Sequence, residues 1–544
     1  MNSKQTLFTD REQLLADIRR GDNCDWDIII VGGGITGAGV LREAVRRGYK
    51  ALLLEQKDFA WGTSSRSSKM VHGGLRYLGM GDIKLTRHSL TERELLLREA
   101  PGLVDRMGYY FTLRKGVFPG RWVFSIMLWL YDRIAGIRDN RYYSTAQLLE
   151  KFPGLEEAGL KGACYYTDAV TDDARLVLRV LQESIASGGS ALNYTAVKEL
   201  IIEQDEVQGV LLTDPDSGEA LCLRAPVVIN ATGAWADRLR GQVNKEKRVR
   251  PLRGSHLVLP GHKLPAAAAL ALMHPGDKRS VFIFPWEGTT VVGTTDLDHN
   301  DDLDTEASIT AQEVDYLLEA ANSQFPKCKL SAADVISTWA GVRPVIGSEQ
   351  SKDPSKERRD HAVWSDHGLI TVSGGKLTTF RLIALDALAA AEARLPKAQP
   401  WDCDRIFSAN STSPESLVPD DKHWGARLLG RYGSAAASLL SASSSSEHKR
   451  IDGTEFSLAE CRWAARHETV VHLDDLLLRR TRLGLLLAGG GESLFEELQA
   501  ICTEELGWNE TRWQAELSRY RQIWLRYYNL PRPEPAVTGE TDAA

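Results

Sequence analysis

The stretch "DIIIVGGGITGAGVLREAVRR", residues 27–47, decides how this chain folds. Residues 27–31 are a short apolar run, rich in β-branched side chains, which is typical of a buried parallel strand. The run leads directly into "GGGITG", which fits the pattern G-x-G-x-x-G, and residues 38–47 then predict a helix. A second apolar run at residues 51–54 ends at Glu55 and completes a predicted βαβ unit.

The three glycines of the pattern have separate physical roles. Gly32 makes the tight turn, Gly34 lets backbone N–H groups approach a pyrophosphate, and Gly37 lets the helix pack closely on the strand. The helix N-terminus attracts the anion, and Glu55 is placed to accept hydrogen bonds from a ribose. We therefore predict a dinucleotide-binding unit, with a purely structural glycine turn as the alternative.

Two later segments favour FAD over NAD. Residues 227–237, "VVINATGAWAD", predict a strand that ends in a turn containing Thr232 and Gly233, which resembles the late strand of two-dinucleotide-binding-type flavoproteins. Residues 369–381, "LITVSGGKLTTFR", predict a strand, a Gly374–Gly375 turn and a helix start, whose N–H groups could face the flavin or its phosphates. A plain strand-to-helix turn is the alternative for each. Together the three units predict one discontinuous cofactor domain.

The composition limits the class of protein and its compartment. A chain of 544 residues needs more than one domain, and a net charge of −7 argues against a general nucleic-acid binder. The seven cysteines are scattered without a C-x-x-C pair, which favours a reducing compartment over a disulfide framework or a zinc site. We expect no secretory signal and no membrane-spanning helix, because no sufficiently long apolar run is present.

Composition shifts predict the domain organisation. The prolines near residues 393–403 mark a boundary, and the residues after it are rich in helix-forming patterns. We predict an N-terminal extension (residues 1–22), a discontinuous FAD-binding and substrate-binding core (23–395), a helical C-terminal domain (401–530) and a disordered tail (531–544).

Cationic side chains stand among glycines and apolar residues. The stretch "SSKMVHGGLRYL", residues 67–78, carries Lys69, His72 and Arg76, and further cations occur in "LRGSHLVLP", "AGVRP" and "GGKLTTF". Burying an arginine without an anion is costly, and several guanidinium groups together would bind a phosphate dianion. Pairing of each cation with a local carboxylate or carbonyl is the alternative. Two further local predictions are an N-cap at Asp172 and a β-hairpin over residues 282–296.

At this point the motifs carry a resemblance. "GGGITGAG", "TSSRSSKMVHGGLRYL", "TDDARLVL", "NATGAWAD", "GSHLVLP", "VGTTD", "AGVRP" and "GGKLTTFR" occur together and in this order. They resemble the FAD-dependent (aerobic, quinone-linked) glycerol-3-phosphate dehydrogenases. The resemblance implies an α/β fold: an FAD-binding Rossmann-like domain, an α+β substrate domain with an antiparallel sheet, and a helical C-terminal domain. It also implies oxidation of sn-glycerol 3-phosphate to dihydroxyacetone phosphate, with hydride transfer to FAD N5 and electrons passed to membrane quinone.

The resemblance also assigns roles to particular residues. Residues that match substrate-pocket positions are Arg76, Tyr77, His256, Arg343, Arg359 and Lys376. Residues that match cofactor positions are Gly32, Gly34, Gly37, Glu55, Thr63, Ser64, Ser65, Thr232, Gly233, Gly374, Gly375, Lys376, Leu377 and Thr378. The catalytic base is His72 or His256, and the choice stays open here. Arg343 and Arg359 are expected to hold the phosphate or to polarise the reacting oxygen.

Several points depart from the family or stay open. Trp61 and Arg66 stand where smaller residues are usual, which we expect to alter the pocket rim. An oxygen-reducing glycerol-3-phosphate oxidase, another FAD-dependent amine or hydroxy-acid oxidoreductase, and a non-catalytic flavoprotein are the rival functions. The resemblance implies a cytoplasmic protein at the inner face of the membrane. We interpret the apolar residues 118–136 as a buried helix, with monotopic membrane contact as the alternative. Homodimer formation is left open.

Overall fold

The βαβ unit at the start of the chain forms as the glycine pattern predicts. The computed structural model describes residues 8, 10–22, 25–116, 120–347, 360–402 and 404–531. The unit consists of β1 (Ile28–Val31), α2 (Ile35–Arg46) and β2 (Ala51–Leu54). Helix α2 begins three residues before the predicted start at residue 38, because Gly34 serves as its N-cap and the last glycine of the pattern lies inside its first turn.

A six-stranded sheet brings the distant cofactor segments side by side. Its strand order is β18-β19-β11-β1-β2-β7. Neighbouring strands from β19 to β7 run parallel, and β18 is an antiparallel edge strand. The strands not yet given are β7 (Ser190–Leu192), β11 (Val227–Asn230), β18 (His361–Asp366) and β19 (Leu369–Gly374). The three predicted units therefore meet at the carboxyl ends of β1, β11 and β19.

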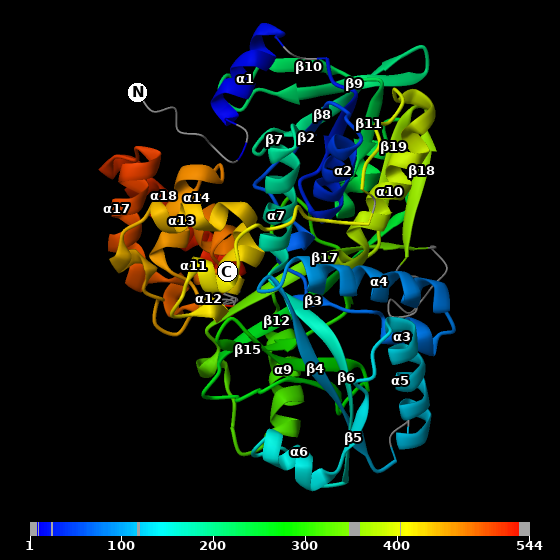
Figure 1. Cartoon of the computed structure of the whole chain (residues 1–544), viewed down its shortest axis with the longest axis vertical. Helices are drawn as coiled ribbons and strands as arrows, with labels where there is room; N and C mark the ends of the chain where they lie inside the picture. The colour runs from blue at the N-terminus through cyan, green and yellow to red at the C-terminus, as the bar shows by residue number, and fades with distance from the viewer. Residues whose placement is uncertain are drawn as a thin grey trace, which may run out of the picture.

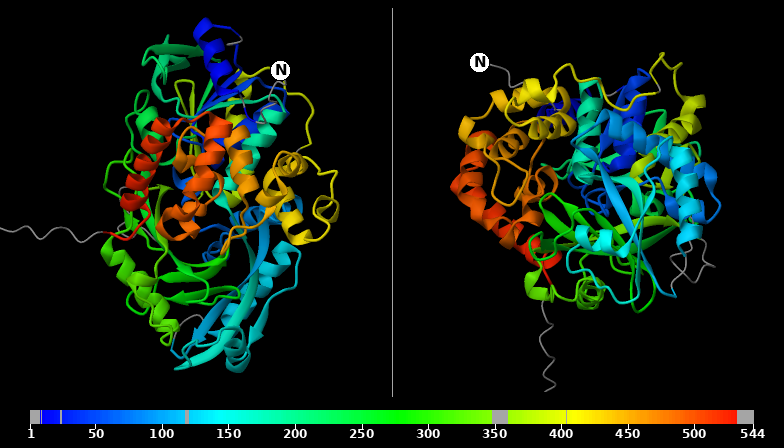
Figure 2. Two further views of the ribbon diagram at one scale, coloured as in Figure 1. Left: turned by 90° about the vertical axis from the view of Figure 1, so that its left-hand side faces the viewer. Right: turned by 60° about the horizontal axis from the view of Figure 1, so that its bottom comes forward.

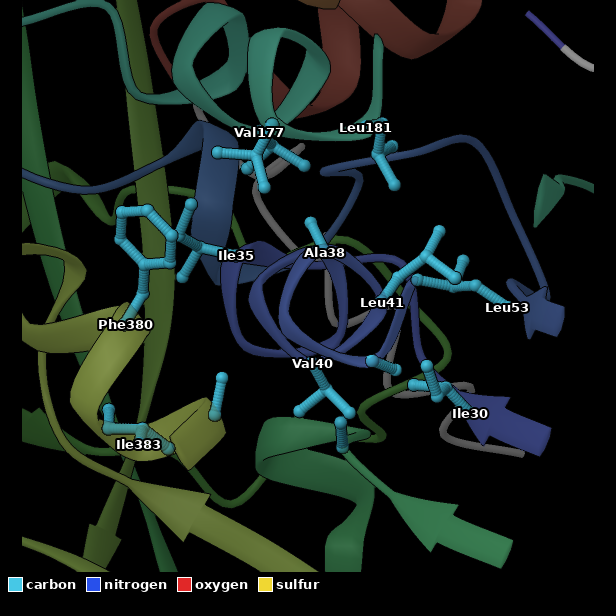
Figure 3. Close-up of a cluster of buried hydrophobic side chains, with 14 of the residues drawn as sticks. Ile30, Ile35, Ala38, Val40, Leu41, Leu53, Val177, Leu181, Phe380 and Ile383 are labelled. Carbon is cyan, nitrogen blue, oxygen red and sulfur yellow. The ribbon is translucent and has the colours of Figure 1, made fainter. Parts of the chain in front are cut away.

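Both faces of this sheet are covered. One face packs against α2, α7 (Asp173–Ala186) and α10 (Phe380–Ala391), where Ile30, Leu53, Val177 and Phe380 form a buried cluster around α2 (Figures 1 and 3). Burying each such side chain contributes roughly 1.5–3 kcal/mol. The other face packs against a smaller antiparallel sheet and two short helices: β8 (Val197–Glu203), β9 (Glu206–Thr213), β10 (Ala220–Arg224), α1 (Arg11–Arg20) and α8 (Ala236–Arg240).

The predicted N-terminal extension contains a helix that joins this core. Leu15 and Ile18 of α1 are buried in the cluster on the second face of the sheet. Asp10 caps the helix by accepting a hydrogen bond from the backbone N–H of Gln13. Residues 11–20 are thus packed as part of the cofactor region.

A larger sheet, mostly antiparallel, forms the lower half of Figure 1. The predicted hairpin is present as β14 (Ser280–Trp286) and β15 (Thr289–Gly293), joined at Glu287 and Gly288. The other strands are β3 (Met70–Val71), β4 (Val104–Arg114), β5 (Arg141–Tyr143), β6 (Leu160–Thr171), β12 (Val249–Pro260), β13 (Ala269–Met273), β16 (Leu297–Asp298) and β17 (Ser337–Ile346). The helices of this region are α3 (Leu75–Gly79), α4 (Ile83–Glu99), α5 (Arg121–Ala135), α6 (Thr145–Lys151) and α9 (Ala311–Gln324). The long pair β12–β17 places His256 directly opposite Trp339.

The C-terminal part is helical and packs along the side of the other two regions (Figure 2). Its helices are α11 (Pro414–Leu417), α12 (Lys422–Tyr432), α13 (Ala436–Ser441), α14 (Leu458–His467), α15 (Leu473–Asp475), α16 (Leu483–Leu486), α17 (Phe495–Leu506) and α18 (Glu510–Tyr527). The predicted tail lies outside the described residues from residue 532 onward.

Buried ion pairs join this helical part to the cofactor region. Asp58, fully buried, accepts hydrogen bonds from Arg479 Nε (2.5 Å) and from Arg480 Nη1 and Nη2 (2.5 and 2.8 Å). Although burial favours the neutral carboxyl, the two guanidinium groups outweigh it and lower the pKa of Asp58 to about 2. Asp172 caps α7 as predicted and also binds Arg482 and Arg431.

The interpretation of residues 118–136 as a buried helix is wrong for the part that the structure describes. Helix α5 buries Phe124 and Leu128, but Trp122 is 75% exposed and Ile126 is 68% exposed. Its two faces are both apolar, and one of them points to solvent. No helix among the described residues is long and apolar enough to cross a membrane.

Candidate active site

A cavity opens at the carboxyl ends of β1, β11 and β19, where the strand order of a parallel sheet leaves room for a ligand. Its volume is about 1220 Å³ with the solvent-filled mouth included. The predicted cofactor residues that line it are Gly32, Gly34, Glu55, Thr63, Ser64, Thr232, Gly233, Gly374, Gly375, Lys376 and Leu377. Gly37, Ser65 and Thr378 are not among the residues that line it. Most of the predicted cofactor residues, which come from separate segments of the chain, therefore line one cavity.

The glycine turn could not carry larger side chains. Gly32 has φ +114°, and a Cβ there would lie 2.6 Å from the carbonyl oxygen of Ala231 on β11. A Cβ on Gly37 would lie 1.9 Å from the carbonyl oxygen of Gly32. Gly34 faces the Ser64 hydroxyl, which accepts a hydrogen bond from the N–H of Ile35 at 3.0 Å. The turn and the start of α2 therefore form a cradle for a pyrophosphate.

Glu55 closes one end of this cradle. Its Oε2 accepts a hydrogen bond from the N–H of Gly33 at 2.6 Å, and its Oε1 accepts one from the N–H of Lys57 at 2.8 Å. Burial raises the pKa of Glu55 above its ordinary value, and the backbone hydrogen bonds oppose this. The side chain is held at the end of β2, where a ribose hydroxyl of a bound dinucleotide would meet it.

Hydrogen bonds connect segments that are far apart in the chain but lie together beside the cavity. The hydroxyl of Thr63 donates to the carbonyl oxygen of Val342 on β17. The backbone N–H of His72 donates to Thr378 Oγ1 at 3.2 Å, and the Thr378 hydroxyl lies 3.3 Å from the His72 carbonyl oxygen. The motif of residues 67–78 is therefore hydrogen-bonded to the segment that follows the Gly374–Gly375 turn.

Two of the predicted substrate residues are in direct contact here. The Nζ of Lys376 lies 3.7 Å from the centroid of the Tyr77 ring and donates to Ser89 Oγ at 3.1 Å. Gly74, with φ +78°, precedes α3, and a Cβ there would lie 2.3 Å from the Tyr77 ring. The glycine thus lets the aromatic ring and the ammonium group approach each other. Arg76 lies on the exposed side of α3.

Arg343 projects from β17 and is half-buried, with local partners. Its Nη1 donates to Asp296 Oδ1 at 3.1 Å, and its Nη2 donates to Thr294 Oγ1 at 2.8 Å. The guanidinium group also lies over Gly254 of β12, where an added Cβ would come within 2.2 Å of Arg343 Nη2. Arg253, another cation noted in the sequence, instead binds Glu313 at 3.1 Å. Pairing with a local carboxylate accounts for Arg253 and holds Arg343 in place.

His256 is the buried histidine of the site. Its side chain is on β12, its ring stacks on Trp339 at 4.8 Å, and its Nε2 lies 2.9 Å from Ser68 Oγ. Burial, then the charges of Arg343 and Lys69, lower the pKa of His256 well below its ordinary value. The imidazole is therefore unprotonated near neutral pH and able to accept a proton. Arg359 lies outside the described residues.

Of the two residues expected to alter the pocket rim, Trp61 is among the residues that line the cavity, whereas Arg66 is buried and is not. Trp61 lines the cavity, and its indole N–H donates to Glu306 at 3.0 Å. Arg66 binds the same Glu306 at 2.7 Å and the Tyr528 hydroxyl at 2.8 Å. Trp235, which was not predicted as a cavity residue, also lines the cavity, and its ring lies 5.8 Å from that of Trp61. Its position, two residues after the Thr232–Gly233 turn, was the available signal.

A pyrophosphate cradle at the carboxyl end of a parallel sheet fits a dinucleotide, as in the class of FAD-dependent oxidoreductases. The family model described as FAD dependent oxidoreductase matches residues 27–381, and the model for the C-terminal domain of alpha-glycerophosphate oxidase matches residues 410–513. The match over residues 27–381 covers more than half of the chain.

Relatives place the chain more narrowly. Glycerol-3-phosphate dehydrogenase 2 of Mycobacterium tuberculosis is 34% identical over 91% of this chain and 87% of that protein. The aerobic glycerol-3-phosphate dehydrogenase of Bacillus subtilis is 38% identical over 71% of this chain and 69% of that protein. The solved structure of glycerol-3-phosphate dehydrogenase from Bacillus halodurans, complexed with FAD, aligns with a TM-score of 0.75 at 28% identity, over 95% of this chain and 98% of that one. The chain belongs to the FAD-dependent glycerol-3-phosphate dehydrogenase family.

Proposed function

We propose that this protein oxidises sn-glycerol 3-phosphate at C2 to dihydroxyacetone phosphate and passes the electrons to a membrane quinone. The observation that carries the substrate is the presence of cations in and beside the cavity: Lys376 lines it, and Arg343 precedes the lining residue Pro344 on β17. Lys376 stands in the cavity wall against Tyr77, and Arg343 lies close enough to His256 to lower its pKa. A phosphate ester with a neighbouring hydroxyl matches this combination of cations and a neutral base.

Each residue of the site then has a role that its surroundings support. Lys376 and Arg76 attract the phosphate, and Arg343 binds a phosphate oxygen or the reacting C2 oxygen. His256 accepts the proton of the C2 hydroxyl, because its buried ring stays neutral and its neighbouring cations stabilise developing negative charge. FAD, when bound, supplies the hydride-accepting N5 atom.

We favour His256 over His72 as the base. The ring of His256 is oriented by a hydroxyl and an indole, and burial and the neighbouring cations keep it neutral. Single His256→Gln and His72→Gln variants, compared in turnover with an artificial dye, separate the two. The proposal expects the large loss in the first variant. A large loss confined to the second would move the base to His72.

The substrate assignment is tested by turnover with a dye acceptor. The proposal expects reduction of the dye with sn-glycerol 3-phosphate and none with glycerol or glycine at the same concentration. Activity with glycine alone would instead favour an amine oxidoreductase. Comparing the yield of peroxide in air with quinone-dependent turnover distinguishes the oxygen-reducing oxidase.

An exposed apolar surface supports a membrane acceptor. We define the apolar face as Met80, Ile83, Trp122, Val123, Ile126 and Trp129, which are each more than half exposed. Met80 follows α3, Ile83 begins α4, and the other four residues lie on α5. The three helices are in contact, with Gly79 at the end of α3 against Met127 of α5 (Figure 1). Arg121 and Arg133 are exposed at the two ends of α5. Apolar and aromatic side chains flanked by cations match the interfacial region of a bilayer.

The apolar face lies next to a helix that carries two of the proposed substrate-binding residues. Helix α3 carries Arg76 and Tyr77 of the site and ends next to Met80 of the apolar face. A quinone that enters along α3 would therefore approach the cationic end of the cavity. We propose that the protein docks at the cytoplasmic membrane through this face.

Sedimentation with lipid vesicles tests the docking surface. A Trp122→Ser, Trp129→Ser double variant is expected to lose vesicle binding and quinone-dependent turnover while it keeps turnover with a soluble dye. Trp401→Ser is the matched control, because Trp401 is an exposed tryptophan that contacts Arg47 away from this face. Unchanged vesicle binding by the double variant would remove the apolar face from the proposal.

A further inference from the structure

The serine–lysine part of the 67–78 motif is built around a buried ion pair. The side chain of Lys69 is fully buried, and its Nζ donates to both carboxylate oxygens of Asp173, at 2.8 and 2.9 Å. The same Nζ donates to the carbonyl oxygen of Ser65 at 2.6 Å. Lys69 has φ +57°, which is uncommon for a residue with a side chain, so its surroundings must hold the turn in this shape. The motif's lysine therefore does not face the cavity.

One indole connects this ion pair to His256. Lys69 Nζ lies 4.7 Å from the centroid of the Trp339 ring, and the His256 ring stacks on the same indole at 4.8 Å with an angle of 16° between the planes. The indole N–H donates to the carbonyl oxygen of Ser67 at 3.1 Å. The loop of residues 65–69, Trp339 and His256 thus form one packed unit.

The imidazole depends on this unit for its orientation. Its Nε2 lies 2.9 Å from Ser68 Oγ, whereas its buried Nδ1 has no hydrogen-bond partner among the described residues. The ring is thus held by one hydroxyl and one stacked indole. The Ser68 hydroxyl belongs to the loop of residues 65–69, and the Trp339 indole is hydrogen-bonded to that loop. The ion pair of Lys69 with Asp173 fixes the loop.

We propose that Ser68, Lys69 and Asp173 are positioning residues for His256, which fix the orientation of its ring and set how readily the ring accepts a proton. This inference rests on the proposed role of His256 as the base. Lys69 acts through Trp339 and touches no reacting atom, so its effect is electrostatic and geometric.

The protonation state of Lys69 decides whether it disfavours protonation of the His256 ring. Burial lowers the pKa of Lys69 to about 7, with Asp173 opposing this and Arg482 reinforcing it. Asp172 is the further carboxylate that faces this group. Below that pH Lys69 carries its positive charge next to the stack. A positive charge there disfavours the imidazolium form.

The charges around His256 act in the same direction. Arg343 faces it from β17 and is itself bound to Asp296, and Lys69 faces it through Trp339. Because Lys69 Nζ and the imidazole contact one indole, they lie within about 10 Å of each other, a distance at which one unit charge shifts a pKa by about one unit at an effective dielectric constant near 20.

Lys69→Gln tests the electrostatic part, because the amide can still donate to Asp173 but carries no charge. The holoenzyme is mixed anaerobically with sn-glycerol 3-phosphate, and the flavin bleaching rate is followed from low to neutral pH. The proposal expects the pH below which the rate falls to move upward by about one unit. Lys263→Gln is the matched control, since Lys263 is a half-exposed lysine paired with Asp334, and it is expected to leave the profile in place.

Histidine NMR provides a readout that does not depend on turnover. Protein labelled with ¹³C at histidine Cε1 is titrated without substrate, and His256→Gln identifies the resonance. Its midpoint should rise by the same amount in Lys69→Gln. A variant that binds FAD with both the rate profile and the His256 midpoint unchanged would reduce Lys69 to a structural role and overturn the proposal.

Ser68→Ala tests the orientation part and serves if Lys69→Gln does not fold. It removes the hydroxyl on Nε2 and leaves the ion pair intact. The bleaching rate is expected to fall at least about tenfold, with recovery in Ser68→Thr and no change in the pH profile. An unchanged rate would overturn the proposal. If sn-glycerol 3-phosphate does not bleach the wild-type flavin at all, the proposed function is wrong. The NMR midpoints of His256 would still test whether Lys69 affects the protonation of its ring.

Discussion

A Gly37→Ala substitution should weaken FAD binding because of one close contact. The added Cβ would lie 1.9 Å from the carbonyl oxygen of Gly32, whereas atoms in contact stay roughly 3 Å or more apart. Helix α2 would have to move away from the turn by about 1 Å, and the N–H groups of the pyrophosphate cradle would move with it. Overpacking of this kind costs about 1–3 kcal/mol. If the cost falls on the bound state, the Kd for FAD rises by roughly 5- to 150-fold.

The assay is titration of the apoprotein with FAD, followed by quenching of flavin fluorescence. Gly120→Ala is the matched control, because a Cβ there meets nothing within 4 Å and Gly120 has an extended backbone that any residue adopts. Far-UV circular dichroism establishes that both variants are folded. A Kd for Gly37→Ala within twofold of the wild-type value would refute the cradle as the FAD site.

Three further outcomes follow from the site and the ion pairs. Arg343→Ala and His256→Ala should keep FAD bound but slow its bleaching by glycerol 3-phosphate by about 10²–10⁴-fold in stopped flow, and wild-type rates would remove both residues from the mechanism. Asp58→Asn should destabilise the fold by about 3–5 kcal/mol in urea unfolding, because Arg479 and Arg480 lose their buried counter-charge, whereas Asp302→Asn at an exposed position should change little. The stabilisation from Asp58 should be complete above its ordinary pKa of 3.8 and be lost as the pH falls through about 2. The difference in the free energy of unfolding between the wild type and Asp58→Asn should therefore decrease over this pH range. A difference that does not change with pH would contradict the assignment.

The cofactor half of the site was predictable because its signals are local. The glycine pattern, the strand before it and Glu55 after it lie within about 30 residues, and each position has a steric or hydrogen-bonding reason of its own. The Thr232–Gly233 and Gly374–Gly375 turns repeat the same strand-to-turn logic. Parallel pairing of β1, β11 and β19 then brings the three segments to one edge.

The buried ion pairs were not predictable, because their partners are far apart in the chain. Arg479 and Arg480 follow a leucine run and look like an ordinary basic helix end, yet both bind Asp58 from more than 400 residues away. Lys69 likewise looked like part of a substrate-binding cationic cluster. Its partner, Asp173, looked like a first-turn acid of a helix. A single sequence contains no signal for which of these charges are buried together.

The surface of α5 was misjudged for a related reason. Phe124 and Leu128 on its buried side and Trp122 and Ile126 on its exposed side are all apolar. A helix that is apolar on every side gives no periodic signal for its solvent face, so a fully buried helix was the natural expectation. What covers the exposed face depends on the surroundings of the protein.

The central claim is that this FAD site takes hydride from glycerol 3-phosphate, and anaerobic reduction of the bound flavin tests it most directly. The purified holoenzyme is mixed with sn-glycerol 3-phosphate in the absence of oxygen and quinone, and with glycerol or glycine in parallel. We predict rapid bleaching of the flavin by the phosphate ester alone. A flavin that dithionite reduces but glycerol 3-phosphate does not would contradict the account and would assign the cationic end of the cavity to another ligand.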